Sequence, residues 1–144
     1  MIRLFIADVS GLDIDACLAS VSPQRREKTL RLKNDDDKRR SLGVELLLEK
    51  AAGRSDYALT ENGKPFFPDG GAYFSLSHCG KYAVCAVSGV PVGADIELAR
   101  DNALRLAERF FMPDEAALVE RSLTPEAEFC RLWTLKESYI KAAD

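Results

Sequence analysis

The sequence predicts an α+β fold, in which an antiparallel sheet packs with helices. Strand-like segments separated by turn-forming residues fill the middle of the chain, between residues 57 and 98. Helical periodicity precedes them and returns from residue 102 onward. The 144 residues, 47% hydrophobic and 30% charged, match about one globular domain.

The N-terminal part predicts one strand followed by two helices. Residues 2–8 alternate aliphatic side chains with others, which is typical of a strand. Ser22-Pro23 predicts a helix start, with the serine as N-cap and the proline in the first turn. Residues 35–52 place their leucines on one helical face, and Gly53 ends that helix.

Turn signals such as Asn62-Gly63 and Cys79-Gly80 divide the middle of the chain into short segments. The strands predicted between the turns cover residues 57–60, 72–77, 82–88 and 92–98. The helices predicted after them cover residues 103–111, 113–121 and 125–143.

Charge and hydropathy exclude several classes of protein. The net charge of −3 gives no general affinity for nucleic acid or for an anionic membrane. The longest apolar runs fall far short of the ~20 residues that a membrane helix needs. Residues 2–7 lack the apolar core of a signal peptide, so we expect a cytoplasmic protein.

Cysteine and histidine usage argues against zinc and against a disulfide scaffold. The four cysteines are scattered without a C-x-x-C pair, and His78 is the single histidine. Carboxylates are abundant, so any divalent metal is expected to be oxygen-ligated Mg²⁺.

Two carboxylates share one face of the predicted strand 92–98. Alternation puts Gly93, Asp95 and Glu97 on that face, with the carboxylates roughly 7 Å apart at the backbone. An ion such as Mg²⁺ would relieve their repulsion, and Gly93 would leave room beside it. A solvated strand face explains the same pattern.

The C-terminal helix carries a second candidate group. Glu137 and Lys141 form an i,i+4 row beside an apolar stripe, to which Lys136 also belongs by phase. The row is either an ordinary surface pair or a place where Glu137 serves as a third metal carboxylate.

Three further segments each have two interpretations. His78 is a core histidine if its strand continues, or a phosphate-binding loop residue if the strand ends at Ser77. Residues 25–40 carry a local excess of four positive charges, which suits a solvated helix or a polyanionic ligand. The turn 62–65 is a plain hairpin turn or a loop that approaches a flat ring at Gly63.

Taken together in order, these segments resemble the Sfp-type 4′-phosphopantetheinyl transferases. The resemblance covers most of the chain and rests on Ser22-Pro23 with Arg25-Arg26-Glu27-Lys28, Arg40-Ser41, Gly63-Lys64-Pro65, Phe74-Ser75-Leu76-Ser77-His78, Val92-Gly93-Ala94-Asp95-Ile96-Glu97, and Trp133-Thr134-Leu135-Lys136-Glu137-Ser138-Tyr139-Ile140-Lys141.

The resemblance implies an enzyme that binds coenzyme A with Mg²⁺. It would transfer the phosphopantetheine arm to a serine of an apo acyl or peptidyl carrier protein and release 3′,5′-ADP. The implied metal ligands are Asp95, Glu97 and Glu137. The implied catalytic residues are Glu137, as general base directly or through a metal-bound water, and Lys141. The implied coenzyme A contacts are Ser77 and Lys141 at the pyrophosphate, Arg25, Lys28, Ser41 and His78 around the 3′-phosphate, and Gly63, Lys64 and Pro65 beside the adenine.

The resemblance also implies a division of the chain. Residues 1–97 would form an N-terminal α+β subdomain, and residues 98–144 the helical start of a second, pseudo-symmetric subdomain whose strands are missing here. We therefore expect either a second copy of the chain against residues 129–144 or disorder near that end. The alternatives to the transferase are a non-catalytic remnant that binds coenzyme A or a carrier protein, and a magnesium phosphohydrolase.

Overall fold

A computed structural model describes residues 1–143 and confirms the α+β fold. Its main sheet is antiparallel, with strand order β1-β5-β4. The strands of this sheet are β1 (Ile2–Asp8), β4 (Tyr73–Cys79) and β5 (Tyr82–Ser88). A small hairpin pairs β2 (Ala58–Leu59) with β3 (Pro65–Phe66). Strand β4 thus lies at one edge of the main sheet, where it pairs with β5.

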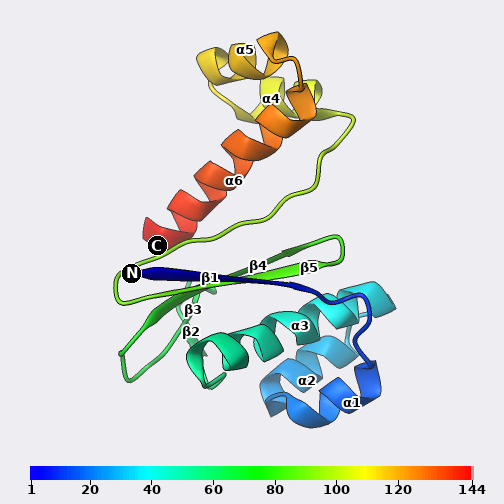
Figure 1. Cartoon of the computed structure of the whole chain (residues 1–144), viewed down its shortest axis with the longest axis vertical. Coiled ribbons are helices and arrows are strands. Elements are labelled where there is room, and N and C mark those ends of the chain that lie inside the picture. The colour runs from blue at the N-terminus through cyan, green and yellow to red at the C-terminus, as the bar shows by residue number, and fades with distance from the viewer. Residues whose placement is uncertain (144) are drawn as a thin grey trace.

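Three helices, α1 (Ile14–Ser20), α2 (Pro23–Leu30) and α3 (Asp35–Ala52), lie on one side of the sheet. Helix α3 packs on the sheet, and α1 and α2 pack against α3 (Figure 1). Helix α3 has the predicted bounds because Asn34 caps its start and Gly53 ends it with a φ of 75°, which glycine adopts without strain. Leu48 and Phe74 are among the buried residues of the core between α3 and the sheet.

The segment 92–98 is not the strand that the alternation predicted. It forms no regular element and crosses the sheet face opposite α3, where Val92 and Ala94 pack on β5. Its backbone is held by serine side chains of β4: Ala94 N–H donates to Ser75 Oγ (3.0 Å) and Ile96 N–H to Ser77 Oγ (3.4 Å). Hydroxyl groups thus replace the backbone partners of a strand.

The last three helices form a second core. They are α4 (Ala103–Phe110), α5 (Pro113–Arg121) and α6 (Pro125–Ala143). Phe129 of α6 is buried there with Val119, whereas Ile140 near the other end of α6 is 58% exposed. The stripe on α6 is therefore covered by α4 and α5 at its beginning, and self-association through residues 129–144 stays a prediction, as does the domain boundary at residue 97.

Helix α6 connects this second core to the sheet. Figure 1 shows it running from α4 and α5 down to the sheet, with its end close to the start of β1. Lys136 lies over the ring of Phe111 and pairs with Glu115 (2.7 Å), so its stem follows the apolar face while its ammonium group reaches a carboxylate. In the part of the chain that the structure describes, no helix has the length and hydropathy to cross a membrane.

Candidate functional site

Strand β4 separates two groups of side chains by its alternation. Phe74, Leu76 and His78 point toward α2 and α3, while Ser75 and Ser77 point toward the segment 92–98. The strand runs to Cys79, so His78 keeps the phase of Phe74. Its side chain is nevertheless exposed at the rim rather than buried in the core.

A cavity of about 240 Å³ lies on the α2 side of β4. Its lining includes Arg25 and Lys28 from α2 and His78 from β4, which the sequence predicted to face one cleft. Arg25 and Lys28 are one helical turn apart, so both project from the same side of α2. Three basic side chains thus share one small cavity.

The pKa of His78 is lowered from its ordinary 6.5. Burial against its neighbours is the largest cause, and the positive charges of Arg40, Lys28 and Arg25 add to it. The carboxylate of Asp37 acts in the opposite sense. Burial and the nearby positive charges therefore both disfavour the imidazolium, and an anion bound in the cavity would relieve the second of these effects.

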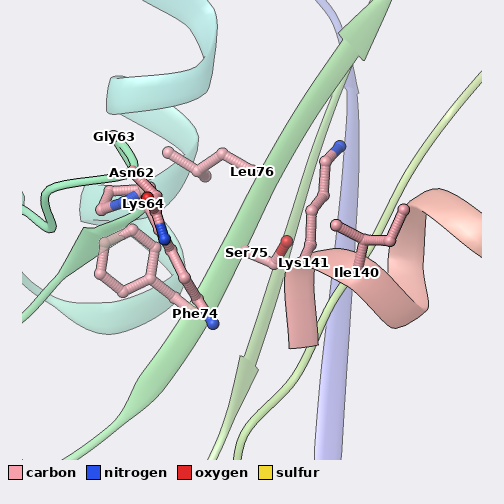
Figure 2. Close-up of a pocket in the computed structure, with 9 residues that line it drawn as sticks. Asn62, Gly63, Lys64, Phe74, Ser75, Leu76, Ile140 and Lys141 are labelled. Atoms are coloured by element: carbon pink, nitrogen blue, oxygen red, sulfur yellow. The ribbon is translucent and has the colours of Figure 1, made fainter. Parts of the chain in front are cut away.

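A second cavity, of about 230 Å³, opens around the edge of β4. Figure 2 shows the turn with Gly63 and Lys64 on one side of the strand and the end of α6 with Lys141 on the other. Gly63 has a φ of 83° and no atom within 4 Å of where a Cβ would stand, so the turn offers an open backbone surface. Both cavities share Gly63, Pro65 and Leu76.

Asp95 is the centre of a hydrogen-bonded group on the second face of β4. Its Oδ1 accepts from Ser77 Oγ (2.7 Å) and from Lys141 Nζ (2.7 Å). Lys141 also donates to the carbonyl of Ala94 (3.3 Å). The Asp95 side chain is 9% exposed and that of Lys141 is 30% exposed, so the carboxylate end of the ion pair is the end shielded from water.

Glu97 lies on the same face of β4 as Asp95, two residues further along the segment 92–98. Its Oε1 accepts from Cys79 Sγ (3.2 Å) and from Arg100 Nη2 (2.7 Å). Burial alone would raise the pKa of Glu97, but the hydrogen bonds from Arg100 and Cys79 outweigh it and hold the pKa below the ordinary value. Glu97 is therefore ionised at neutral pH.

The predicted magnesium ligands fit the ion in chemistry but are not gathered into one group. Asp95 and Glu97 supply oxygen donors, and Glu137 lies one turn before Lys141 on α6. Within residues 1–143, however, no three acidic, cysteine or histidine side chains converge closely enough to hold a metal. The positive charge beside Asp95 and Glu97 comes from Lys141 and Arg100 instead.

Gly93 has a different role from the one that the sequence suggested. A Cβ at Gly93 would stand 1.8 Å from the carbonyl oxygen of Ser138 and 2.8 Å from the backbone nitrogen of Ala142. The space beside Gly93 is thus filled by the backbone of α6 rather than left for an ion. This close approach brings Lys141 to Asp95.

Ser41 is placed between helices rather than in the cavity. It is buried, and its hydroxyl lies 2.8 Å from Thr29 Oγ1 in the α2–α3 interface. The residue that α3 sends toward Arg25 is Glu45, which the sequence analysis did not single out. The sequence did contain a pattern that could have identified Glu45. It is an acidic residue three positions from both Leu42 and Leu48, on the buried side of a helix.

The fold and the cleft define an α+β protein with two linked, partly cationic cavities that suit a ligand carrying several phosphate groups. Comparisons with known proteins agree with that class. A family model described as the 4′-phosphopantetheinyl transferase superfamily matches residues 91–144. A 4′-phosphopantetheinyl transferase of Bacillus subtilis is 34% identical over 146 residues, which cover 94% of this chain and 65% of that protein.

Two further relatives match in the same way. The 4′-phosphopantetheinyl transferase Sfp of Bacillus subtilis strain 168 is 34% identical to this chain. The alignment covers 86% of this chain and 60% of the length of Sfp. The 4′-phosphopantetheinyl transferase HetI of Nostoc is 40% identical to this chain. The alignment covers 70% of this chain and 46% of the length of HetI. Over most of its length the chain is similar to 4′-phosphopantetheinyl transferases, and it spans less than two thirds of the length of these relatives.

Proposed function

We propose that the chain binds coenzyme A across the edge of β4 and transfers the phosphopantetheine arm to a serine of an apo carrier protein. The observation that carries this proposal is the pair of cavities that share Gly63, Pro65 and Leu76. Coenzyme A has a 3′-phosphate and a diphosphate, which need two separate cationic sites joined by a nucleoside-sized space.

Each part of the ligand then has a counterpart in the cleft. Arg25, Lys28 and His78 would receive the 3′-phosphate on the α2 side. The open backbone of the turn at Gly63 would lie against the adenine. Lys141 and the hydroxyl of Ser77 would contact the diphosphate on the other side of β4.

The reaction requires the serine oxygen of the carrier to attack the phosphorus that bears pantetheine. Glu137 would accept the serine proton, a new bond would form from the serine oxygen to phosphorus, and the bond to 3′,5′-ADP would break. Lys141 would hold the diphosphate and stabilise charge on the leaving group. Asp95, Glu97 and Glu137 are the residues that would hold Mg²⁺, which when bound neutralises diphosphate charge.

Mass spectrometry of an apo carrier protein, incubated with this chain, coenzyme A and Mg²⁺, tests the proposal. We expect the carrier to gain the mass of phosphopantetheine and 3′,5′-ADP to appear in equal amount. Release of 3′,5′-ADP with an unmodified carrier would contradict the transferase and favour the phosphohydrolase. A matched reaction with the carrier serine changed to alanine separates transfer from adventitious labelling.

One observation favours a second candidate, a domain that binds coenzyme A or carrier protein without transfer. Lys141 neutralises Asp95 directly, and no three carboxylates converge among the described residues. Binding of coenzyme A in a calorimeter, together with an unchanged carrier mass at all Mg²⁺ concentrations, would establish this candidate instead.

A further inference from the structure

We propose that Glu45 is a positioning residue that fixes the guanidinium of Arg25 for recognition of the 3′-phosphate. The inference rests on the proposed function, because it assumes that the cavity beside α2 receives that phosphate. It goes further by assigning a role to a buried residue of α3 that does not itself line the cavity.

Glu45 uses both of its carboxylate oxygens to hold the start of α2. Oε2 accepts from Arg25 Nε at 3.0 Å, and Oε1 accepts from the backbone N–H of Ser22 at 2.7 Å. Glu45 is 1% exposed and Arg25 is 7% exposed. A carboxylate so deeply buried is tolerated only when its charge and lone pairs are satisfied, so its geometry is narrowly defined.

Tyr57 holds the same guanidinium from the other side. Arg25 Nη2 donates to the Tyr57 hydroxyl, and the guanidinium lies 5.9 Å from the centre of the Tyr57 ring. The Tyr57 ring in turn packs edge-on against Phe74 of the core, 6.0 Å between centroids. These two bonds use Nε and Nη2 of Arg25, and neither involves the Nη1 amino group.

A guanidinium anchored at two points presents its remaining N–H groups in a fixed direction. Phosphate recognition by arginine depends on such a planar, pre-oriented fork, because less side-chain entropy is lost when the ligand binds. Glu45 also contributes to the placement of Lys28. This lysine follows Arg25 by one turn on the helix whose N-cap, Ser22, is bound by Glu45. One buried carboxylate thus holds Arg25 directly and also holds the start of the helix that carries Lys28.

The experiment compares two ligands that differ only in the 3′-phosphate, 3′,5′-ADP and 5′-AMP, by calorimetry on the full chain. The quantity of interest is the ratio of their affinities. We expect Glu45→Gln to reduce this ratio roughly tenfold, while the affinity for 5′-AMP stays unchanged. Tyr57→Phe should reduce it by a smaller factor, roughly threefold. Glu45→Asp, which keeps the charge, should restore part of the ratio.

Glu49→Gln is the matched control, because Glu49 lies one turn later on α3 and is exposed. It should leave both affinities unchanged. Equal weakening of both ligands by Glu45→Gln and Tyr57→Phe would show that the pair merely supports the fold, and would overturn the inference. If Glu45→Gln does not fold, Tyr57→Phe decides by the same ratio. A wild-type chain that does not distinguish the two ligands would contradict the proposed coenzyme A site itself.

Discussion

The two faces of β4 build their charged groups in opposite ways. On the α2 side, cations line the cavity, and the carboxylate that orients Arg25 is Glu45, buried between helices. On the other side, Asp95 and Glu97 are the candidate ligands, and cations are bound directly to them. The first face is anchored in the main core, whereas the second depends on the docking of α6.

This difference indicates that the face with Asp95 and Glu97 is easier to perturb than the face with Arg25. Arg25 is fixed by residues within one packed unit of α2, α3 and the sheet. Lys141 reaches Asp95 across 46 sequence positions, and the segment that carries Asp95 is held by serine hydroxyls rather than by strand pairing. Experiments should therefore perturb the two faces separately, and we order four predictions from the largest expected effect to the smallest.

Gly93→Ala should have the largest effect. The added Cβ would collide with the backbone of α6 at Ser138 and Ala142, which cannot move aside like a side chain. We expect the free energy of unfolding to fall by about 3 kcal/mol or more, or α6 to detach from the sheet. Thermal unfolding and hydrogen exchange at residues 136–143 measure this. Gly89→Ala, where a Cβ meets nothing within 4 Å, is the control. An equal effect at both glycines would refute the close docking.

Lys141→Ala should weaken coenzyme A binding roughly tenfold, because a charged hydrogen bond to phosphate is lost. It should leave the affinity ratio of 3′,5′-ADP to 5′-AMP unchanged, since that ratio reports on the other face. Lys28→Glu should weaken coenzyme A binding and also lower this ratio, while Lys33→Glu, on an exposed position outside the cavity lining, should change neither. Calorimetry measures all three. If Lys28 and Lys33 variants behave alike, the basic run acts as a diffuse field.

Ser41→Ala should lower the free energy of unfolding by about 1 kcal/mol, because it removes the buried hydrogen bond to Thr29. Binding of 3′,5′-ADP should be unaffected. Ser20→Ala, on an exposed position of α1, provides the control in the same denaturation experiment. A loss of ligand affinity without a loss of stability would instead return Ser41 to the phosphate site.

His78 should show the smallest effect, in its titration. NMR should report a midpoint below 6.5, and 3′,5′-ADP should raise it, because a phosphate favours the imidazolium. The folded pKa lies below the unfolded one, so His78 contributes stability above pH 6.5 that is lost as the pH falls toward the folded pKa. A midpoint that ligand does not move would place the phosphate elsewhere. The chain has one histidine, which makes the signal unambiguous.

Local signals in the sequence predicted most of the elements. Residues 35–52 and 82–88 have the expected bounds because caps and turns define them within a few positions. The helix Ile14–Ser20 was missed, although Asp13 caps it, because it is short and its one buried residue is Leu18. The segment 92–98 was wrongly predicted as a strand because alternation also suits a chain that packs one face on a sheet.

The site was predictable as a set of residue types and not as a geometry. The resemblance selected Asp95 and Lys141, but their ion pair depends on the path of α6 after Gly93, which no local pattern encodes. The Arg25–Glu45 pair was not foreseen because helix periodicity alone does not show which neighbour a buried carboxylate meets. The sequence alone therefore did not predict these two long-range ion pairs.

Helix α6 makes the two cores mechanically dependent on each other. Its 19 residues form one unbroken rod, roughly 28 Å long, with Phe129 buried among α4 and α5 and Lys141 at the opposite end. Such a rod acts as a lever: a tilt of about 5° at the buried end displaces the far end by about 2 Å. That displacement is comparable to the 2.7 Å length of the Lys141–Asp95 ion pair, so a change in how α6 packs on α4 and α5 would alter that ion pair in the cleft.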